Sequence, residues 1–267
     1  MKVSIIIPTF KPKEYLYECL DSLRNQTFDK HDFEVILILN GPSIPYEQKI
    51  LDYKDKHKEL QLIYLYTEVT GVSNARNLGI DVARGAFLGF IDDDDYVSNT
   101  YIEELYYQSD KTTIGLSYPY AFKDGESNIQ LRYGITDDYN RYAPKGVMCY
   151  LKPKKYFSGS CMKLIHRDII GNRRFDIRFK NGEDSLFMFL ISDLMDKVGF
   201  TSKRAVYYRR FRKESASMKN KHIGEYIINR YKMIKCYSVV FWGNIGHYSF
   251  YFYITRLLGS VKTIFFH

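Results

Sequence analysis

The chain contains a short, unbroken apolar run, Phe87–Ile91, that ends in four consecutive carboxylates, Asp92–Asp95. Apolar residues at every position, rather than at every second one, are typical of a strand covered on both faces of a parallel sheet. Two like charges about 4 Å apart repel each other by roughly 1 kcal/mol even in water, and by more near a protein interior. A buried strand that ends in four carboxylates therefore indicates a compensating cation at its carboxyl end.

The four aspartates predict a metal site, because carboxylate oxygens are hard ligands that select Mg²⁺ or Mn²⁺. Mg²⁺ commonly keeps water and substrate phosphate among its ligands, so a phosphorylated substrate would fit beside it. In open α/β sheets, ligands bind beyond the carboxyl ends of the strands, which is where this cluster is expected. A solvated acidic loop or a helix N-terminus is the simpler alternative, because Asp favours the first turn of a helix. The four residues alone leave both interpretations open.

The segments around this run predict a doubly wound α/β domain with a mostly parallel sheet, because apolar runs alternate with helical periodicity through residues 1–90. We expect Pro8 to end the first strand and Gly85 to cap the third helix. No Gly-x-Gly-x-x-Gly follows the first strand, which argues against a Rossmann dinucleotide-binding domain. The expected strands are Val3–Ile7, Phe33–Leu39, Leu62–Tyr66 and Phe87–Ile91, and the expected helices begin near Tyr15, Glu47 and Gly71.

A later helix is predicted from Asn181-Gly182-Glu183-Asp184, with Asn181 as its N-cap. Glu183 and Asp184 suit the positive N-terminus of a helix, so a capping role alone would explain both acids. The helix after Gly71 is expected to bury Val72, Ala75, Leu78, Gly79 and Val82 and to carry Arg76 among its polar residues. Elsewhere the pattern predicts a helix over Tyr101–Gln108, a single strand over Ile114–Phe122, a loop-rich stretch over 123–155 and a strand over Ala205–Phe211.

The net charge of +8 is concentrated near the C-terminus. Residues 203–267 contain 13 Lys or Arg against Glu214 and Glu225, a balance of +11, so residues 1–202 sum to −3. Such asymmetry predicts an anionic partner, either nucleic acid or an acidic membrane surface. The uncharged stretch Ser238–Thr255 is too polar to span a bilayer convincingly, but its aromatic residues and basic neighbours suit an interfacial segment. Because the basic residues of this segment are mixed with apolar stretches, a membrane is favoured over nucleic acid as the partner.

The expected location is the cytoplasm, at the inner face of the plasma membrane. The four cysteines are scattered, without metal-ligand spacing or a disulfide-dense pattern, so we expect reduced thiols. The first strand is expected directly after Met1 and Lys2, which leaves no charged-then-apolar signal peptide.

Five motifs in this order resemble the family 2 glycosyltransferases of the GT-A fold. They are Ser4–Thr9, Cys19–Leu23 with Gln26 and Thr27, Gly71–Ile80, Phe90–Asp95 and Gly182-Glu183-Asp184. The resemblance covers about residues 1–215. It implies a GT-A domain in which residues 1–100 bind a nucleotide-sugar and residues 101–215 bind the acceptor. Residues 216–267 would form a basic, aromatic helical extension.

The resemblance also implies roles for individual residues. Pro8, Thr9, Asn40, Arg76 and Asp93 would bind the nucleotide. The metal, Mn²⁺ or Mg²⁺, would be held by Asp92, Asp94 and Asp95 on the donor diphosphate. Asp184 would be the general base for an inverting displacement, and Glu183 would orient the acceptor. The expected donor is a UDP-linked sugar, and the expected acceptor is a glycan or lipid-linked glycan of a cell-surface polysaccharide, such as a capsule or lipopolysaccharide.

Two positions depart from the family pattern. Asn40 stands where the family usually has Asp, which affects recognition of the nucleobase, and Met162 stands near a position where relatives often have an aromatic residue. Asn40 also suits an alternative, a non-catalytic subunit of the same fold that binds a nucleotide-sugar or glycan. A nucleic-acid enzyme with a two-metal site is a third hypothesis. A glycosidase would use two carboxylates but needs no metal cluster.

Overall fold

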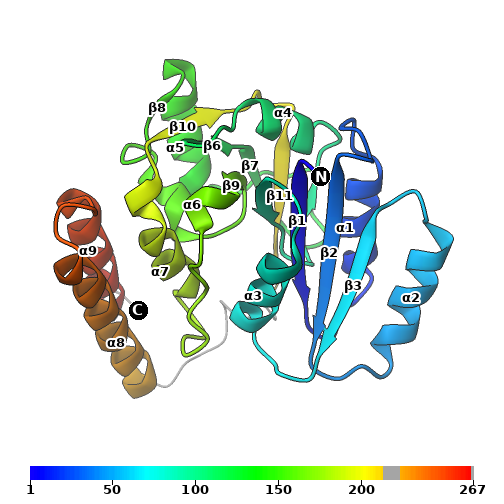
Figure 1. Cartoon of the computed structure of the whole chain (residues 1–267), viewed down its shortest axis with the longest axis horizontal. Helices are drawn as coiled ribbons and strands as arrows, with labels where there is room; N and C mark the ends of the chain where they lie inside the picture. The colour runs from blue at the N-terminus through cyan, green and yellow to red at the C-terminus, as the bar shows by residue number, and fades with distance from the viewer. Residues whose placement is uncertain (213–222, 266–267) are drawn as a thin grey trace.

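An eight-stranded sheet forms the centre of the computed structural model, which describes residues 1–212 and 223–265. Its strands are β1 (Val3–Thr9), β2 (Phe33–Asn40), β3 (Leu62–Thr67), β4 (Phe87–Phe90), β6 (Thr113–Leu116), β8 (Met148–Cys149), β9 (Lys163–His166) and β10 (Lys197–Phe200). The strand order is β3-β2-β1-β4-β9-β6-β10-β8 (Figure 1). β1 pairs in parallel with β2 and β4, whereas β9 is antiparallel to both β4 and β6. The predicted α/β class with a mostly parallel sheet is confirmed.

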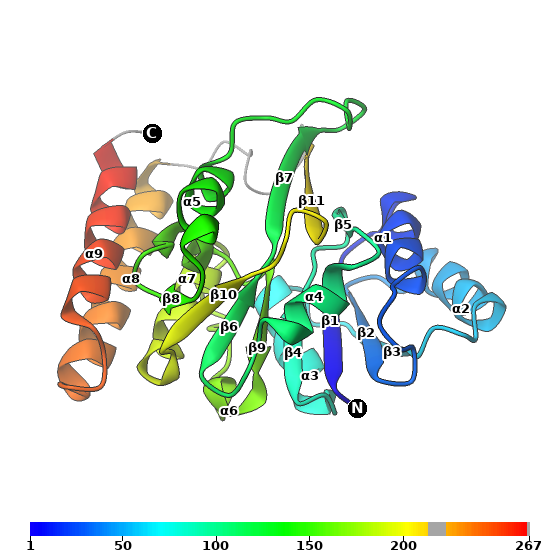
Figure 2. The same ribbon diagram turned by 90° about the horizontal axis from the view of Figure 1, so that it is seen from above.

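Helices cover both faces of the parallel block. α1 (Tyr15–Arg24) and α2 (Tyr46–Lys56) lie on one face, and α3 (Val72–Val82) lies on the other (Figure 2). Every residue of β1 and β2 is buried, as the unbroken apolar runs predicted. α1 buries Leu16, Cys19, Leu20 and Leu23, which is the helical spacing expected of its inner face. The order of strands and helices predicted for residues 1–90 is therefore confirmed.

A second, three-stranded sheet stands beside the acidic turn. It has the order β5-β11-β7, with β5 (Tyr96–Val97), β11 (Val206–Phe211) and β7 (Tyr118–Lys123). The single strand predicted over residues 114–122 is wrong, because the chain leaves the large sheet at Ser117 and enters the small one as β7. Ser117 donates from its backbone N–H and its hydroxyl to Met162 O. Pro119 fits the edge position of β7, where a missing N–H removes no ladder bond.

Two boundaries near the site differ from the prediction. Pro8 lies inside β1, which continues to Thr9. The backbone groups of Ile6 and Pro8 point to the same side of β1, the side of β4, where Ile6 O accepts from Ile91 N. β4 ends before it reaches Pro8, so the missing N–H of proline removes no hydrogen bond there. Gly85 does not cap α3, whose C-cap is Ala83. Its N–H donates instead to Ser4 Oγ at 2.8 Å, because the chain crosses close to β1.

The second half of the chain ends in a helical hairpin. α8 (Ile223–Gly243) and α9 (Phe250–Phe265) pack against each other, and both contact α7 (Glu183–Leu190) (Figure 1). The predicted helical extension is confirmed, whereas its expected boundary at residues 215 and 216 lies outside the described residues. Among the described helices, none is both long and apolar enough to cross a membrane. The remaining helices are α4 (Tyr101–Tyr107), α5 (Gly134–Tyr142) and α6 (Arg167–Ile170), with short 3-10 turns at Ala143–Lys145, Lys154–Ser158 and Ser192–Leu194.

The crossing at Gly85 gives a prediction for the fold. A Cβ at this position would lie 2.5 Å from Ser4 N and 2.6 Å from Val3 C, backbone atoms that cannot move aside. Gly85→Ala is expected to lower the free energy of unfolding by about 1–3 kcal/mol, as overpacking does. Gly224→Ala is the matched control, because a Cβ there would meet no atom within 4 Å. Urea unfolding curves measure both changes, and equal midpoints for the two variants would contradict the close approach.

Candidate active site

A pocket of about 540 Å³ lies where the carboxyl ends of β1, β2 and β4 meet the first turns of α3 and α7. Eight of the ten predicted site residues line it, namely Pro8, Asn40, Arg76, Asp92, Asp93, Asp94, Glu183 and Asp184. Thr9 and Asp95 do not line it. The sheet edge predicted from the strand ends is therefore the edge that carries the cluster. Acids separated by about 90 residues in the sequence share one wall.

Arg76 joins the two acidic regions at the base of this pocket. Its side chain is only 3% exposed, and its guanidinium donates to Asp184 Oδ1 at 2.7 Å and to Asp92 Oδ1 at 2.8 Å. The guanidinium also lies over the ring of Phe175, 5.4 Å from its centroid. Burial opposes the charge, but Asp184 and Asp92 raise the pKa of Arg76 above its ordinary value. Arg76 is therefore a buried cation that holds α3, the acidic turn and α7 together.

The burial of Arg76 rotates α3 relative to the predicted orientation. Its buried residues are Ser73, Ala75, Arg76, Gly79 and Ile80. Val82, which was expected inside, is 40% exposed. The prediction treated Arg76 as part of a polar face, but two carboxylates from distant segments hold its guanidinium inside.

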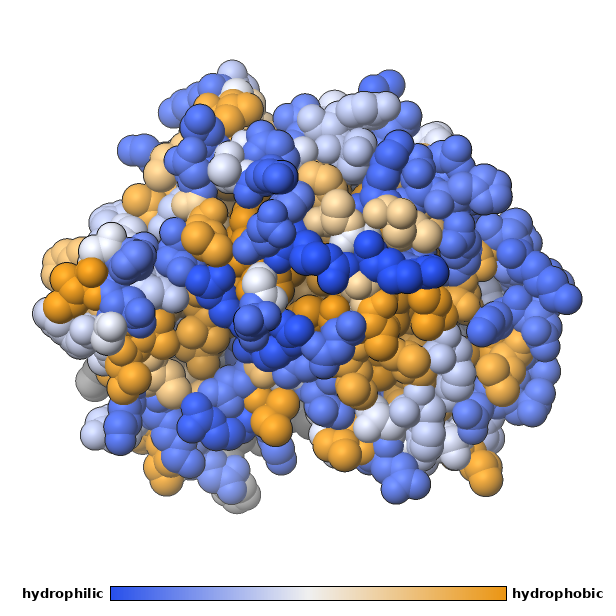
Figure 3. Space-filling view, in the orientation of Figure 1, coloured by the Kyte–Doolittle hydropathy of each residue, from blue (hydrophilic) through white to orange (hydrophobic). Residues whose placement is uncertain are grey.

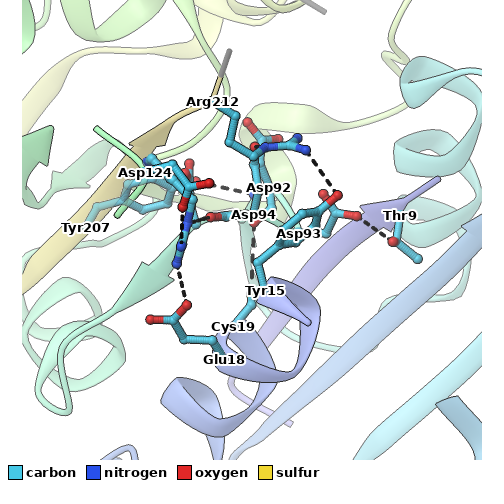
Figure 4. Close-up of polar contacts among 12 residues, drawn as sticks. Thr9, Tyr15, Glu18, Cys19, Asp92, Asp93, Asp94, Asp124, Tyr207 and Arg212 are labelled. Carbon is cyan, nitrogen blue, oxygen red and sulfur yellow. Dashed lines mark hydrogen bonds and ion pairs between the residues drawn. The ribbon is translucent and has the colours of Figure 1, made fainter. Parts of the chain in front are cut away.

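Asp92 and Asp93 differ in their ionisation although they are neighbours. Burial opposes ionisation of Asp92, but the charges of Arg76 and Arg209 outweigh it, and its pKa is lowered. Burial and the nearby charge of Asp94 instead raise the pKa of Asp93 to about 7, although the Thr9 hydroxyl donates to its Oδ2 at 2.5 Å. Figure 4 shows Asp93 pointing toward Thr9. Thr9 thus supports Asp93 from outside the pocket.

Asp94 and Asp95 point in different directions. Arg212 Nε donates to Asp94 Oδ2 at 2.6 Å, while burial and the charge of Asp92 raise the pKa of Asp94 (Figure 4). Asp95 is 2% exposed, and its Oδ1 accepts from Arg210 N at 2.7 Å. Burial raises the pKa of Asp95 well above its usual range. Asp95 therefore faces the small sheet, away from the pocket.

Asn40, at the end of β2, links the end of β1 to the N-terminus of α3. Its Nδ2 donates to Thr9 O at 2.7 Å, and its Oδ1 accepts from Gly71 N at 3.0 Å. Both ends of the amide are therefore used within the protein, although Asn40 also lines the pocket. An Asp at this position would lack the N–H that Thr9 O accepts, which gives a structural reason for Asn.

Glu183 and Asp184 form the first turn of α7. The N-cap is Gly182, with φ 88°, and not Asn181 as predicted, because the left-handed conformation favours glycine. Asp184 Oδ1 accepts from Arg76 and from Ser160 Oγ at 3.1 Å. Burial and the charge of Asp184 raise the pKa of Glu183 to about 7. The two acids of this pair therefore have different environments, which a capping role alone does not explain.

Ser160 and Lys163 belong to the segment 159–163, which the sequence did not connect with the site. Lys163 is 1% exposed and donates to Gly159 O at 2.7 Å and to Cys161 O at 2.6 Å. These bonds fix the backbone of segment 159–163. Burial lowers the pKa of Lys163 to about 8. Met162 has a positive φ of 69°, uncommon for a residue with a side chain. Segment 159–163 thus positions Ser160 beside Asp184. No short sequence motif identifies this segment as part of the site.

Several cations of the pocket were also missed. Arg209, Arg210 and Arg212 were counted with the basic C-terminal segment, but they lie on or just after β11. Arg209 and Arg212 line the pocket, whereas Arg210 bonds to the acidic turn without lining the pocket. Arg210 Nε donates to Asp94 O at 2.9 Å, and its guanidinium also pairs with Glu18 and Asp124 (Figure 4). The alternation of a strand could have suggested that Arg210 and Arg212 point one way and Arg209 the other. The pocket wall also includes Lys11, Lys13 and Lys180.

The carboxylate oxygens of the acidic turn are chemically suited to bind a divalent metal ion. Within residues 1–212 and 223–265, no group of three or more Asp, Glu, His or Cys is arranged to hold a metal by itself. Three consecutive carboxylates nevertheless line one pocket, and all of their donor atoms are oxygens. An ion that keeps substrate phosphate among its ligands needs only one or two carboxylates from the protein.

Comparison with known proteins identifies the family. Residues 4–173 match the family described as Glycosyl transferase family 2. The chain belongs to this family. The predicted family and enzyme class, glycosyltransferase, are therefore confirmed.

The relatives are longer proteins. The minor teichoic acid biosynthesis protein GgaB of Bacillus subtilis (strain 168) is 29% identical over 218 residues, which cover 80% of this chain but 23% of GgaB. The poly(ribitol-phosphate) beta-N-acetylglucosaminyltransferase TarS of Staphylococcus aureus (strain Mu50) is 27% identical over 215 residues, 78% of this chain and 35% of TarS. The chain thus spans about a quarter to a third of these relatives.

Solved structures confirm the GT-A type of fold. S. aureus TarS 1-349 in complex with UDP superposes with a TM-score of 0.72 at 20% identity, covering 99% of this chain and 72% of that one. The mannosyltransferase PcManGT from Pyrobaculum calidifontis, in complex with GDP-Man and Mn²⁺, superposes with a TM-score of 0.62 at 13% identity, covering 99% and 70%. At these identities the likeness is evidence for the fold alone.

The position of Arg76 gives a stability prediction. Arg76→Met would leave Asp92 and Asp184 buried together without their shared cation, and breaking a buried ion pair costs about 3–5 kcal/mol. Arg174→Met is the matched control, because Arg174 pairs with the half-exposed Asp81 at the surface, where ion pairs are worth about 0–1 kcal/mol. Chemical denaturation measures both. Similar small losses for the two variants would show that Arg76 does not hold the site together.

Proposed function

We propose that this chain is the catalytic domain of an inverting, metal-dependent hexosyltransferase. It would move a sugar from a UDP-linked donor to a glycan or lipid-linked acceptor of a cell-surface polysaccharide. The observation that carries the proposal is the buried bridge from Asp92 through Arg76 to Asp184, which places two differently supported carboxylates in one pocket. The names of GgaB and TarS support the polymer class, because the first refers to teichoic acid and the second to poly(ribitol-phosphate).

The donor is proposed to bind in the half formed by residues 1–100. Pro8, Asn40 and Asp93 line the pocket at the strand ends, where open α/β sheets bind ligands. Thr9 would act indirectly, because its hydroxyl is bonded to Asp93. The cations Lys11 and Lys13 also line this pocket and suit a diphosphate. A related structure of TarS contains UDP-GlcNAc, which supports a UDP-sugar.

Mn²⁺ or Mg²⁺ would be held by Asp92 and Asp94 together with the donor diphosphate. When bound, such an ion neutralises charge on the departing diphosphate. Asp92 is already paired with Arg76 and Asp94 with Arg212, so the protein offers partly occupied carboxylates. Asp95 would support the turn from beneath, since its carboxylate accepts from Arg210 N. The Mn²⁺ in the related PcManGT complex supports metal use in this fold.

Asp184 is proposed as the general base of the half formed by residues 101–215. It would accept the proton of the acceptor hydroxyl while that oxygen bonds to the anomeric carbon and the bond from this carbon to the diphosphate oxygen breaks. A single displacement inverts the anomeric configuration. Hydrogen bonds from Arg76 and Ser160 fix one carboxylate oxygen of Asp184. Glu183, with a pKa of about 7, would orient the acceptor in either protonation state.

The alternatives are less well supported by the arrangement of charges. A non-catalytic binding subunit was suggested by Asn40, but the bonds of Asn40 to Thr9 and Gly71 explain that residue without loss of catalysis. A nucleic-acid enzyme would use its arginines as a phosphate track, whereas Arg210 is paired with Glu18 and Arg212 with Asp94 of the pocket. We therefore propose no nucleic-acid partner.

We further propose that the protein acts at the inner face of the plasma membrane through its helical hairpin. Exposed apolar side chains gather on α8, α9 and the turn between them, on the left of Figure 3, and an anionic bilayer would cover them. They are Val239, Trp242, Ile245, Phe250, Tyr251 and Leu258.

The first functional prediction concerns the base. Asp184→Asn is expected to lower kcat by at least about 100-fold, the effect of losing general base catalysis, with donor binding nearly unchanged. Asp168→Asn is the matched control, because Asp168 also lies in the first turn of a helix but is 70% exposed outside the pocket. Release of free nucleotide from a panel of nucleotide-sugars measures the rates. Transfer by Asp184→Asn at the parent rate would remove Asp184 from the mechanism.

The second concerns the metal. Asp94→Asn should weaken Mn²⁺-dependent donor binding at least tenfold, which corresponds to about 1.4 kcal/mol, because one oxygen ligand and its charge are lost. Without Mn²⁺ the variant and the parent should bind the donor alike. Asp196→Asn, on the surface beside Lys197, is the control. Calorimetric titration with and without Mn²⁺ tests this, and an undiminished effect of Mn²⁺ on the variant would refute the ligand assignment.

A further inference from the structure

An apolar groove of about 530 Å³ runs between α7 and α8, outside the pocket described above. Its floor is made by α7, by one stripe of α8 and by the loop that precedes α7. The side chains from α8 follow one another at helical spacing, so they form a continuous wall. The lining residues are Asp176, Arg178, Phe179, Leu186, Leu190, Lys232, Lys235, Cys236, Val239 and Val240.

The opposite stripe of α8 explains why this wall stays open. Met233, Tyr237 and Phe241 are at most 6% exposed and pack into the core. These contacts fix α8 against α7 and leave Val239, 63% exposed, at the groove. The space-filling view shows hydrophobic side chains in this region of the molecule (Figure 3). An apolar groove held open by a packed helix is suited to an apolar ligand.

The charges at the rim select an anion. Lys232 and Lys235 are exposed and make no ion pair with any residue in the described part of the chain. Arg178 lies across the rim, bonded to Asp176 at 2.6 Å and 3.8 Å from Cys236 Sγ. Three cations and one acid leave the rim with an excess of positive charge. An apolar floor with a basic rim complements a hydrocarbon chain attached to a phosphate.

One segment of the chain, residues 176–190, lines both the groove and the proposed acceptor side of the active site. Lys180, Asn181, Glu183 and Asp184 face the pocket, while Phe179, Leu186 and Leu190 face the groove. α8 also bonds directly to this segment, where Asn229 Nδ2 donates to Asn181 O at 3.1 Å. A ligand in the groove would thus lie beside the segment that presents the proposed base.

We propose that the groove binds the hydrocarbon chain of an anionic lipid whose phosphate-linked headgroup is the acceptor. This inference rests on the proposed function and narrows its acceptor to the lipid-linked class. The lipid chain lies along α7, its phosphate meets Lys232 and Lys235, and its sugar faces Asp184. A bilayer surface, a free phosphate and a second copy of the chain are the other occupants that an experiment must distinguish.

The thiol of Cys236 lies in the groove and provides a direct test on the unmodified protein. Decyl phosphate, used as a monomer below its critical micelle concentration, should slow alkylation of Cys236 by a maleimide at least fivefold. Ethyl phosphate, which lacks the chain, and decyl maltoside, which lacks the phosphate, should each slow it less than twofold. Cys149 is the internal control, since it is exposed among Lys152 and Lys154 in a different cavity. Mass spectrometry of the two peptides gives both rates.

Variants place the protection in the groove. Val239→Glu should abolish the protection of Cys236 by decyl phosphate without changing the melting temperature, because Val239 is largely exposed. Val82→Glu on α3, where Val82 is 40% exposed, should keep it. Equal protection of Cys149 and Cys236, or equal protection by ethyl phosphate or decyl maltoside, would overturn the proposal. So would protection that survives in Val239→Glu, or that depends on protein concentration, as a second copy would require.

The same samples separate this inference from the proposed function. Binding of a UDP-sugar with Mn²⁺ is measured by calorimetry on the unmodified protein. If the donor binds and Cys236 is not protected, the lipid groove is refuted and the transferase proposal stands. If Cys236 is protected and no nucleotide-sugar binds, the proposed donor fails while the lipid site remains. A fivefold protection that needs both chain and phosphate supports the groove as proposed.

Discussion

The rest of the site depends on the buried ion pairs that the guanidinium of Arg76 makes with Asp92 and Asp184. A buried cation is costly to desolvate, and it is retained only where its partners are equally well placed. Asp92 at the end of β4 and Asp184 in α7 meet that requirement from opposite sides. Arg76 therefore determines how far the acidic turn lies from the first turn of α7. The charge of Arg76 also lowers the pKa of Asp92, whereas burial and neighbouring carboxylates raise the pKa values of Asp93 and Glu183 to about 7.

The acidic turn shows what a charge argument from sequence can and cannot determine. Four successive carboxylates do require compensating cations, but the protein supplies several of them from the other end of the domain, on β11. Arg210 and Arg212 bond to the turn, and the charge of Arg209 lowers the pKa of Asp92. The fold thus has cations of its own. In the proposed function, a donor diphosphate would bring further negative charge into the pocket, and a divalent ion would compensate that charge.

Local pattern predicted much of the fold, and long-range contacts explain where it failed. Unbroken apolar runs gave the parallel strands of residues 1–90, because burial on both faces leaves a local signature. The chain that leaves the large sheet at Ser117 is bonded there to Met162, and glycine at position 182 suits both its positive φ and the nearby side chain of Met233 from α8. Motifs located most of the pocket. They did not reveal that Asp95 faces the small sheet and not the pocket, since the side chains of consecutive residues in a turn diverge.

The hairpin of α8 and α9 packs against α7, the helix that carries Glu183 and Asp184. A Cβ on Gly182 would lie 2.5 Å from Met233 Sδ, so Met233 of α8 lies directly against the residue that caps α7, two positions before Asp184. Cores are closely packed, and a shift of α8 would therefore be transmitted to the first turn of α7. Asp184 is at the same time bound to Arg76, which resists that shift from the donor side. The proposed base thus lies between two supports, the packing of α8 against the N-cap of α7 and the buried ion pair with Arg76.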